Sequence, residues 1–252
     1  MTSQKPFRWS SFSQPKKGHS LAEYEDSAAA DLSVCRFAIA DGASESSYSG
    51  EWANKLTFGF IENSLLQAPN GWADWLPPLQ KLWANSVPAS PENISWFAEE
   101  KLHDGAFATF LGLEFTLLPN ERTYQAIAVG DSCLFHVRDD KLVKAFPLQA
   151  ASEFSSRPAL LSSKPRSAGK TPMEKRLLAN FLPGDIFYLM TDALACWFLT
   201  ELESGKKPWL DLNDIRSLPT PEMFFETWVT TQRESAALKN DDITLLVIDA
   251  LE

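Results

Sequence analysis

The sequence predicts an α+β fold, a four-layer α-β-β-α sandwich in which two packed antiparallel sheets lie between outer layers of helices. The strand candidates are nearly continuous apolar runs, such as FAIAD at 37–41 and ITLLVID at 243–249. They lack the polar alternation of a sheet with one face in water, so both faces are expected to be covered. A short link between two of these strands favours antiparallel pairing. Antiparallel strands buried on both faces indicate two stacked sheets with helices outside.

Seven segments are predicted as strands from their apolar, β-branched and aromatic content. They are Val34–Ala40, Phe107–Leu117, Thr123–Val129, Cys133–Val137, Lys141–Phe146, Ile186–Met190 and Ile243–Ile248. We expect Thr123–Val129 and Cys133–Val137 to form an antiparallel hairpin, because only Gly130-Asp131-Ser132 joins them.

Six segments are predicted as helices from their length, periodicity and flanking residues. They are Gly50–Gln67, Trp72–Asn85, Pro91–Leu102, Met173–Leu182, Ala193–Leu202 and Pro221–Glu234. Pro91 and Pro221 suit a first helical turn, and Pro183-Gly184 stops the chain before a strand.

The region Leu148–Pro172 is rich in Ser, Pro, Ala and Lys and has no clear period. We interpret it as a long surface excursion, because apolar strand material resumes after it. A single domain is therefore expected over residues 1–252.

Composition makes nucleic-acid and membrane partners poor hypotheses. The 252 residues are 44% hydrophobic and include nine Trp and seventeen Phe, enough for a sizeable core. The formal net charge is −10, whereas nucleic acids and anionic membranes attract clustered Lys and Arg. No apolar segment resembles a signal peptide or approaches a membrane span. Cys35, Cys133 and Cys196 are interpreted as reduced core thiols, and a cytoplasmic location is expected.

Aspartates stand at the ends of three predicted strands. Asp41 and Asp192 follow strands, whereas Asp241 and Asp242 precede the last one. If the last strand runs antiparallel to the other two, these carboxylates share one edge of the sheet, and Asp131 in the hairpin turn is a fourth candidate. Clustered carboxylates repel one another and each buried charge costs solvation, so such a cluster calls for cations or solvent.

Oxygen ligands select hard ions, namely Mg²⁺, Mn²⁺ or Ca²⁺. Gly42 lets the backbone come close, so that its carbonyl can serve as a further ligand. A lone Asp at a strand end is, however, more often a turn or cap residue. Spacing alone leaves both interpretations open.

Motifs in consistent order add specificity. They are EYEDS at 23–27, FAIADGAS at 37–44 with GEWA at 50–53, AIAVGDSCLFHV at 126–137, LPGDIFYLMTDAL at 182–194 and NDDITLLVI at 240–248. Over nearly the whole chain, Gly18–Ile248, this series resembles the type 2C serine/threonine protein phosphatases, the metal-dependent PPM family, in a bacterial-like single-domain form. The resemblance implies the same four-layer sandwich.

The resemblance also implies a metal centre with two divalent cations, Mn²⁺ or Mg²⁺, and a weaker third ion. Asp41 would bridge the two ions, the Gly42 carbonyl would assist, and Asp192 and Asp241 would complete one coordination shell. Asp41, Asp192 and Asp241 are the catalytic residues it implies. Asp131 would belong to the third ion. The resemblance also implies supporting residues that do not bind the metals directly. Glu25 and Asp26 would hold metal-bound water molecules, and Asp242 stands where the family usually has Asn.

Two departures from the family's pattern concern the substrate. Leu21 stands where the family commonly has an Arg that binds the phosphate, and Leu cannot supply the fork of a guanidinium. His19, Lys16 or Lys17 are the candidate substitutes, and His19 is the residue we assign to phosphate binding. No His follows the Asp41-Gly42 pair to protonate a leaving alcohol. Ala193 replaces the usual Gly after Asp192.

The activity implied is hydrolysis of phosphoserine and phosphothreonine in proteins by a water that two metals activate, opposed by a serine/threonine kinase. The alternative is a catalytically weak or inactive phosphatase-like module that binds a regulatory partner, and the missing Arg and His support it. A third hypothesis is a phosphatase of small-molecule or anti-sigma-type phospho-substrates.

Overall fold

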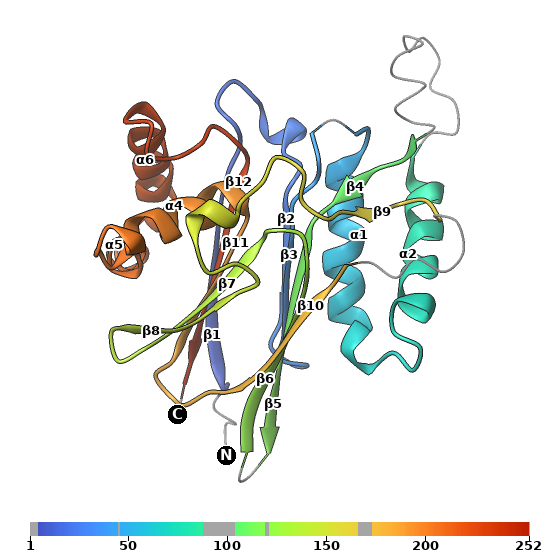
Figure 1. Ribbon diagram of the computed structural model, residues 1–252, viewed down its shortest axis with the longest axis horizontal. Helices are drawn as coiled ribbons and strands as arrows, with labels where there is room; N and C mark the ends of the chain where they lie inside the picture. Colours follow the sequence, from blue (N-terminus) through green and yellow to red (C-terminus); the bar gives the residue numbers. More distant parts are fainter. Residues whose placement is uncertain (1–4, 45, 88–103, 119–120, 166–172, 252) are drawn as a thin grey trace.

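The computed structural model describes residues 5–44, 46–87, 104–118, 121–165 and 173–251. Two five-stranded antiparallel sheets stack face to face between two groups of helices, so the predicted four-layer sandwich is confirmed (Figure 1).

One sheet has the order β1 (Phe7–Gln14), β12 (Ile243–Ala250), β11 (Ile186–Met190), β7 (Cys133–Arg138) and β8 (Lys141–Phe146). The other has the order β10 (Lys175–Asn180), β6 (Glu121–Val129), β5 (Phe110–Leu118), β3 (Arg36–Ala40) and β2 (Ser27–Asp31). A small third sheet pairs β4 (Phe107–Ala108) with β9 (Leu161–Ser162).

Helices cover the outer face of each sheet (Figure 1). Two of them, α1 (Ser49–Glu62) and α2 (Trp72–Ser86), pack on the sheet that contains β3. The opposite sheet is covered by α4 (Asp192–Glu203), α5 (Pro208–Arg216) and α6 (Pro221–Glu234). Short 3₁₀ turns lie at η1 (Leu21–Glu23), η2 (Leu65–Gln67) and η3 (Ala151–Glu153).

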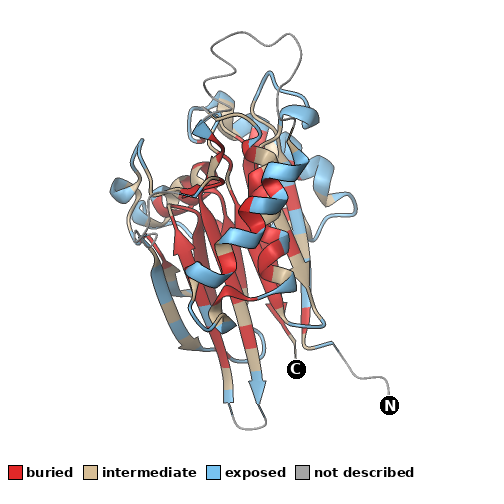
Figure 2. Cartoon of the chain, turned by 90° about the vertical axis from the view of Figure 1, so that its right-hand side faces the viewer, coloured by how far each residue is buried: buried red, intermediate tan, exposed pale blue. Residues whose placement is uncertain are grey.

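Strand β12 shows why the central strands are apolar on both faces. All eight of its residues are buried. Leu246 and Ile248 point into the core between the two sheets, whereas Leu245 and Val247 point into the core beneath the helices. Successive side chains point to opposite faces, so a strand with both faces covered presents apolar residues to each, and its two buried polar residues, Thr244 and Asp249, are hydrogen-bonded. In Figure 2 the strands at the centre are accordingly buried.

Several predicted elements differ from the observed ones. Met173–Leu182 was predicted as a helix but contains β10, whose Lys175 pairs with Ala128 along the free edge of β6. Sheet pairing overrides helix propensity here. The strand predicted over Phe107–Leu117 is divided at Thr109 into β4 and β5. Strands β1 and β2 and helix α5 were not predicted, and Pro91–Leu102 lies outside the described residues.

The predicted hairpin of Thr123–Val129 with Cys133–Val137 is wrong. Strand β6 pairs with β5 and β10, whereas β7 pairs with β8 and β11 in the opposite sheet. Gly130-Asp131-Ser132 therefore carries the chain from one sheet to the other. Gly130 has a φ of 100°, and Thr109 packs so closely that a side chain at Gly130 would clash with it. This crossing brings Asp131 to the end of the sandwich that holds the other aspartates.

Candidate metal centre

Strand register brings the predicted aspartates to one end of the sandwich. Ala40 pairs with Ser27, so Asp41 and Asp26 follow and precede directly paired residues. In the other sheet, Met190 pairs with Leu245, and Asp192 and Asp242 lie just beyond this pair, at the same end of the strands. Because β3 and β11 belong to different sheets, the carboxylates lie at a common end of both sheets and not, as predicted, on the edge of one.

The electrostatics of Asp41 show that these residues share one environment. Burial raises the pKa of Asp41 well above its usual range, and the charges of Asp26, Asp192, Asp131 and Asp241 raise it further. Each of these partners comes from a different segment of the chain. The end of the sandwich therefore gathers five aspartates, four of which the resemblance assigns to metal ions.

Asp26 is the most deeply placed of these carboxylates. It is 6% exposed, and burial raises its pKa to about 8 although Thr244 Oγ1 donates a 2.8 Å hydrogen bond to Oδ2. Its other oxygen, Oδ1, is buried and has no hydrogen-bond partner among the described residues. An unpaired buried carboxylate oxygen is costly. It is suited to accept a hydrogen bond from a bound water or to contact a cation.

Asp131 presents the same feature from the crossing between the sheets. Asp131 is 6% exposed, and burial and the charge of Asp192 raise its pKa to about 7. Within the part of the chain that the structure describes, its Oδ1 has no hydrogen-bond partner. Burial likewise raises the pKa of Asp192, which opens helix α4 and whose Oδ1 accepts a 2.6 Å hydrogen bond from the amide of Ala193. Protons or cations would relieve this concentration of buried negative charge.

Asp242 has a different task, which is to position the loop that leads into the site. Its Oδ1 accepts a 2.7 Å hydrogen bond from the amide of Lys16, and its Oδ2 accepts one of 2.7 Å from the amide of Glu25. Both oxygens are thus engaged with backbone. Asp241, by contrast, directs its carboxylate toward Lys239. Asp241 Oδ1 also accepts a 3.2 Å hydrogen bond from the amide of Asp242, so Asp241 keeps one oxygen, Oδ2, that contacts only Lys239 among the described residues.

Gly42 and Glu25 fix the backbone next to Asp41. The amide of Gly42 donates to the carbonyl of Glu25 at 3.2 Å, and Ser49 Oγ donates to Glu25 Oε1. A Cβ at position 42 would lie 2.7 Å from the Glu25 carbonyl oxygen and 2.8 Å from the Ser49 carbonyl carbon. The chain therefore requires glycine here, because two other backbone segments occupy the space.

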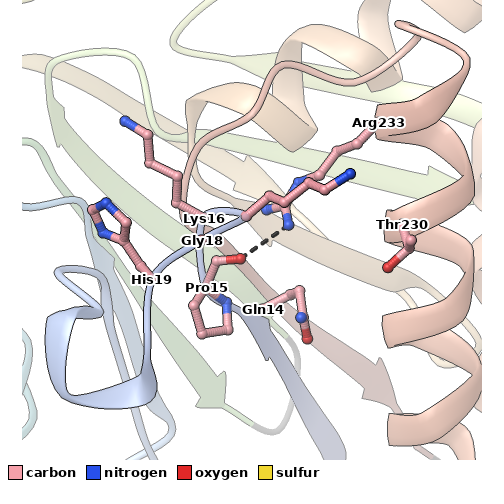
Figure 3. A pocket seen from close by; sticks show the side chains of 8 residues that line it. Gln14, Pro15, Lys16, Gly18, His19, Thr230 and Arg233 are labelled. Atoms are coloured by element: carbon pink, nitrogen blue, oxygen red, sulfur yellow. Dashed lines mark hydrogen bonds between the residues drawn. The ribbon is translucent and has the colours of Figure 1, made fainter.

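His19 lines a pocket of about 250 Å³ beside this centre, together with Gln14, Pro15, Lys16, Lys17, Gly18, Thr230 and Arg233. Arg233 Nη1 donates to the carbonyl of Pro15 at 2.9 Å, and Nη2 donates to that of Asp241 at 2.5 Å. In Figure 3 the side chains of Lys16 and His19 extend to the side of the loop away from Arg233. Arg233 thus ties the His19 loop to the aspartate loop.

Arg233 and Lys239 are the site residues that the sequence did not predict. Lys239 Nζ lies 2.7 Å from Asp241 Oδ2 and 3.3 Å from Asp192 Oδ2. Lys239 stands two residues before Asp241 of the NDDIT motif. This closeness in sequence was the only indication that Lys239 could lie at the site. No sequence signal connected Arg233 with the site, because helix α6 lies outside every motif.

The carboxylates of this cluster are suited to divalent cations, although they are not arranged as a complete coordination shell. In the described part of the chain, no three His, Cys, Asp or Glu side chains already form a metal-binding group. The clustered carboxylates, the unpaired buried oxygens of Asp26 and Asp131, and the close packing of Gly42 nevertheless fit oxygen-coordinated ions. The residues present therefore fit Mg²⁺ or Mn²⁺, once Lys239 has left the two carboxylates that it contacts.

The architecture is that of the metal-dependent PPM phosphatases, so the resemblance seen in the motifs is confirmed at the level of the fold. No protein-family model and no curated protein sequence matches the chain. Among solved structures, the chain is similar to the photosystem II phosphatase PBCP, with a TM-score of 0.59, 14% identity and coverage of 96% of this chain and 98% of that one.

Two mycobacterial structures are similar as well. The Mycobacterium tuberculosis serine/threonine phosphatase PstP gives a TM-score of 0.57 at 15% identity and covers 98% of this chain and 99% of its own. The PPM Ser-Thr phosphatase MsPP from Mycobacterium smegmatis, in complex with cacodylate, gives 0.56 at 14% identity with coverage of 97% and 98%. At these identities the likeness establishes the fold.

None of the helices in the described ranges is long and apolar enough to cross a bilayer.

Proposed function

We propose that this chain is a metal-dependent phosphatase that hydrolyses phosphoserine and phosphothreonine in proteins. The observation that carries the proposal is the convergence of Asp26, Asp41, Asp131, Asp192 and Asp241 at one end of the sandwich. The catalytic domain of PstP, whose fold is similar (TM-score 0.57, 16% identity), was crystallised with two manganese ions. The fold and the carboxylate cluster together support divalent cations as cofactors.

Asp41, the Gly42 carbonyl, Asp192 and Asp241 would hold two Mn²⁺ or Mg²⁺ ions, and Asp131 would belong to a weaker third. When bound, the ions would supply Lewis-acid activation of water and neutralise charge on the phosphoryl oxygens. Asp41 is suited to the shared position, because it interacts electrostatically with the carboxylates of both sheets.

The surrounding residues hold this arrangement in place. Glu25 links the start of α1, through Ser49, to the amide of Gly42. Asp26 is kept in position by Thr244 and leaves one oxygen free to accept a hydrogen bond from water. Asp242 fixes the loop that carries His19, so that His19, Lys16 and Lys17 lie on the approach to the site. We assign His19 to the attraction of the substrate phosphate.

The proposal is tested with the full chain and a phosphoserine or phosphothreonine peptide, with p-nitrophenyl phosphate as a second substrate. Hydrolysis should require Mn²⁺ or Mg²⁺ and stop with EDTA. Asp41→Asn and Asp192→Asn should each lower kcat at least about 100-fold, because each removes a charged ligand. Asp211→Asn makes the same change on the exposed face of α5 and should leave kcat unchanged. Absence of turnover with Mn²⁺, Mg²⁺ and Co²⁺ would contradict the proposal.

The second candidate is a phosphatase-like module that binds a phosphorylated or regulatory partner without turnover. Leu21, in place of the phosphate-binding Arg, is 76% exposed and makes no polar contact through its side chain. This hypothesis expects binding of Mn²⁺ or of a phosphopeptide with no release of phosphate. Substrate profiling against small phosphate esters and phosphoproteins tests the third hypothesis. An opposing kinase and a cytoplasmic location stay predictions.

A further inference from the structure

Lys239 places an ammonium group between two of the carboxylates that are proposed to bind one ion. Its Nζ lies 2.7 Å from Oδ2 of Asp241 and 3.3 Å from Oδ2 of Asp192. The two carboxylates come from different segments, the loop before β12 and the first turn of α4, so a single side chain bridges both sides of the proposed coordination shell. Among the described residues, Lys239 is therefore the cation in most direct contact with the acidic cluster.

The backbone around Lys239 is held firmly, whereas its side chain is free to move. The amide of Asp241 donates to the Lys239 carbonyl at 3.1 Å, Lys17 donates its amide to Asn240 Oδ1 at 2.8 Å, and Arg233 holds the Asp241 carbonyl. The side chain of Lys239 is 63% exposed. Its flexible four-carbon stem can thus leave the carboxylates for solvent without any change in the loop.

A divalent ion and this ammonium cannot share the two carboxylates without a penalty. An ion held by Asp192 and Asp241 would sit about 2 Å from their oxygens. The ammonium contacts the Oδ2 atom of each of the same two residues. Two cations at such a separation repel strongly, because a partly buried site screens them less than bulk water does.

We propose that Lys239 is a tethered cation that competes with the divalent ion for Asp192 and Asp241, and thereby sets the metal concentration at which the site is loaded. The inference rests on the proposed metal centre and adds its regulation. Before loading, Lys239 neutralises part of the cluster. On loading, it moves to solvent and the divalent ion takes over its two partners. Activity would therefore require a higher concentration of Mn²⁺ or Mg²⁺ than a site with no internal competitor would need.

The test measures Mn²⁺ binding directly, by isothermal titration calorimetry on the full chain. Lys239→Met keeps the length of the stem and removes the charge, and Lys239→Arg keeps the charge. Lys206→Met is the matched control, because Lys206 is 64% exposed and its Nζ lies 2.7 Å from Glu201. Lys239→Met removes the competing charge, so the Kd for Mn²⁺ should fall. Because exposed ion pairs are weak, the expected decrease is about threefold to tenfold. A tenfold change equals about 1.4 kcal/mol.

Lys239→Arg and Lys206→Met should stay within about twofold of the unaltered protein. A second measurement separates competition from a merely structural role. With EDTA present, Lys239→Met should melt at a lower temperature than the unaltered chain, and saturating Mn²⁺ should remove the difference.

An unchanged or weaker Mn²⁺ affinity in Lys239→Met would overturn the inference while leaving the proposed function intact. Absence of any Mn²⁺ binding by the unaltered chain would overturn the metal centre and the competition with it.

Discussion

Gly42→Ala changes the backbone around the proposed centre and leaves every carboxylate in place. The added methyl group would lie 2.7 Å from the carbonyl oxygen of Glu25, 2.8 Å from the carbonyl carbon of Ser49 and 2.9 Å from its Cβ. Ordinary contacts between such atoms lie near 3.5–4.0 Å. Two of these neighbours are backbone atoms, one before β2 and one in the first turn of α1, so no rotamer change relieves the clash.

The magnitude follows from the kind of atoms that must move. Overpacking in a well-packed region costs about 1–3 kcal/mol, and the rigid surroundings of Gly42 place the expected loss of unfolding free energy in the upper half of that range. Relief requires α1 or the Glu25 segment to shift by several tenths of an ångström. Either shift moves the carbonyl of Gly42 and the adjacent Asp41. We therefore expect Mn²⁺ affinity to fall at least about tenfold, which corresponds to 1.4 kcal/mol.

Urea unfolding monitored by Trp fluorescence measures the stability, and calorimetric titration measures Mn²⁺ affinity. Gly59→Ala is the control in the same helix. Its added methyl group meets only the side-chain carbons of Leu79, which can rotate away, and alanine favours the helix by up to about 1 kcal/mol. If Gly42→Ala unfolds at the urea concentration of the unaltered chain and binds Mn²⁺ equally well, the reasoning about this close approach is refuted.

Two further predictions concern charge. Burial raises the pKa of Asp131 to about 7 and that of Asp26 to about 8, above the value near 3.9 expected in the unfolded chain. Between about pH 4 and pH 8 the folded state therefore binds more protons than the unfolded state. In EDTA the free energy of unfolding should consequently fall as the pH rises. A free energy of unfolding that is constant or rises over this pH range in urea titrations would contradict the prediction. Asp185→Ala should cost about 3–5 kcal/mol, because Asp185 is fully buried and its Oδ2 is hydrogen-bonded to His136 Nε2 at 2.8 Å. Glu51→Ala, in a half-exposed i,i+4 ion pair with Lys55, should cost at most about 1 kcal/mol in the same unfolding assay.

The central strands could be predicted from the sequence because their burial is visible in every residue. Strands β12 and β11 show the apolar runs that two covered faces require, and their predicted and observed bounds agree closely. The strands that were missed or misassigned, β1, β2, β9 and β10, all lie at sheet edges. In β10 the residues alternate between exposed and half-buried. These edge strands lack the continuous apolar signal of the central strands, although β8, also at an edge, was predicted with its observed bounds.

The hairpin error has a different origin. Three residues between two strands are typical of a local turn, and nothing in Gly130-Asp131-Ser132 distinguishes a turn from a crossing between sheets. The distinction depends on β10 and β11, which come much later in the chain and pair with β6 and β7 in their separate sheets. Asp131 nevertheless reaches the predicted end of the molecule, because both connections would place it beyond the end of β6.

Which residues form the acidic cluster could be anticipated, but how its charge is balanced could not. Strand ends and motif order bring Asp41, Asp192 and Asp241 together. The balance depends on Lys239, whose reach from the loop before β12 to the start of α4 is a property of tertiary geometry. It also depends on Asp242, both of whose oxygens accept hydrogen bonds from the backbone amides of Lys16 and Glu25. A sequence motif therefore predicts which charges meet, whereas the affinity for metal depends on the neighbours that compete for them.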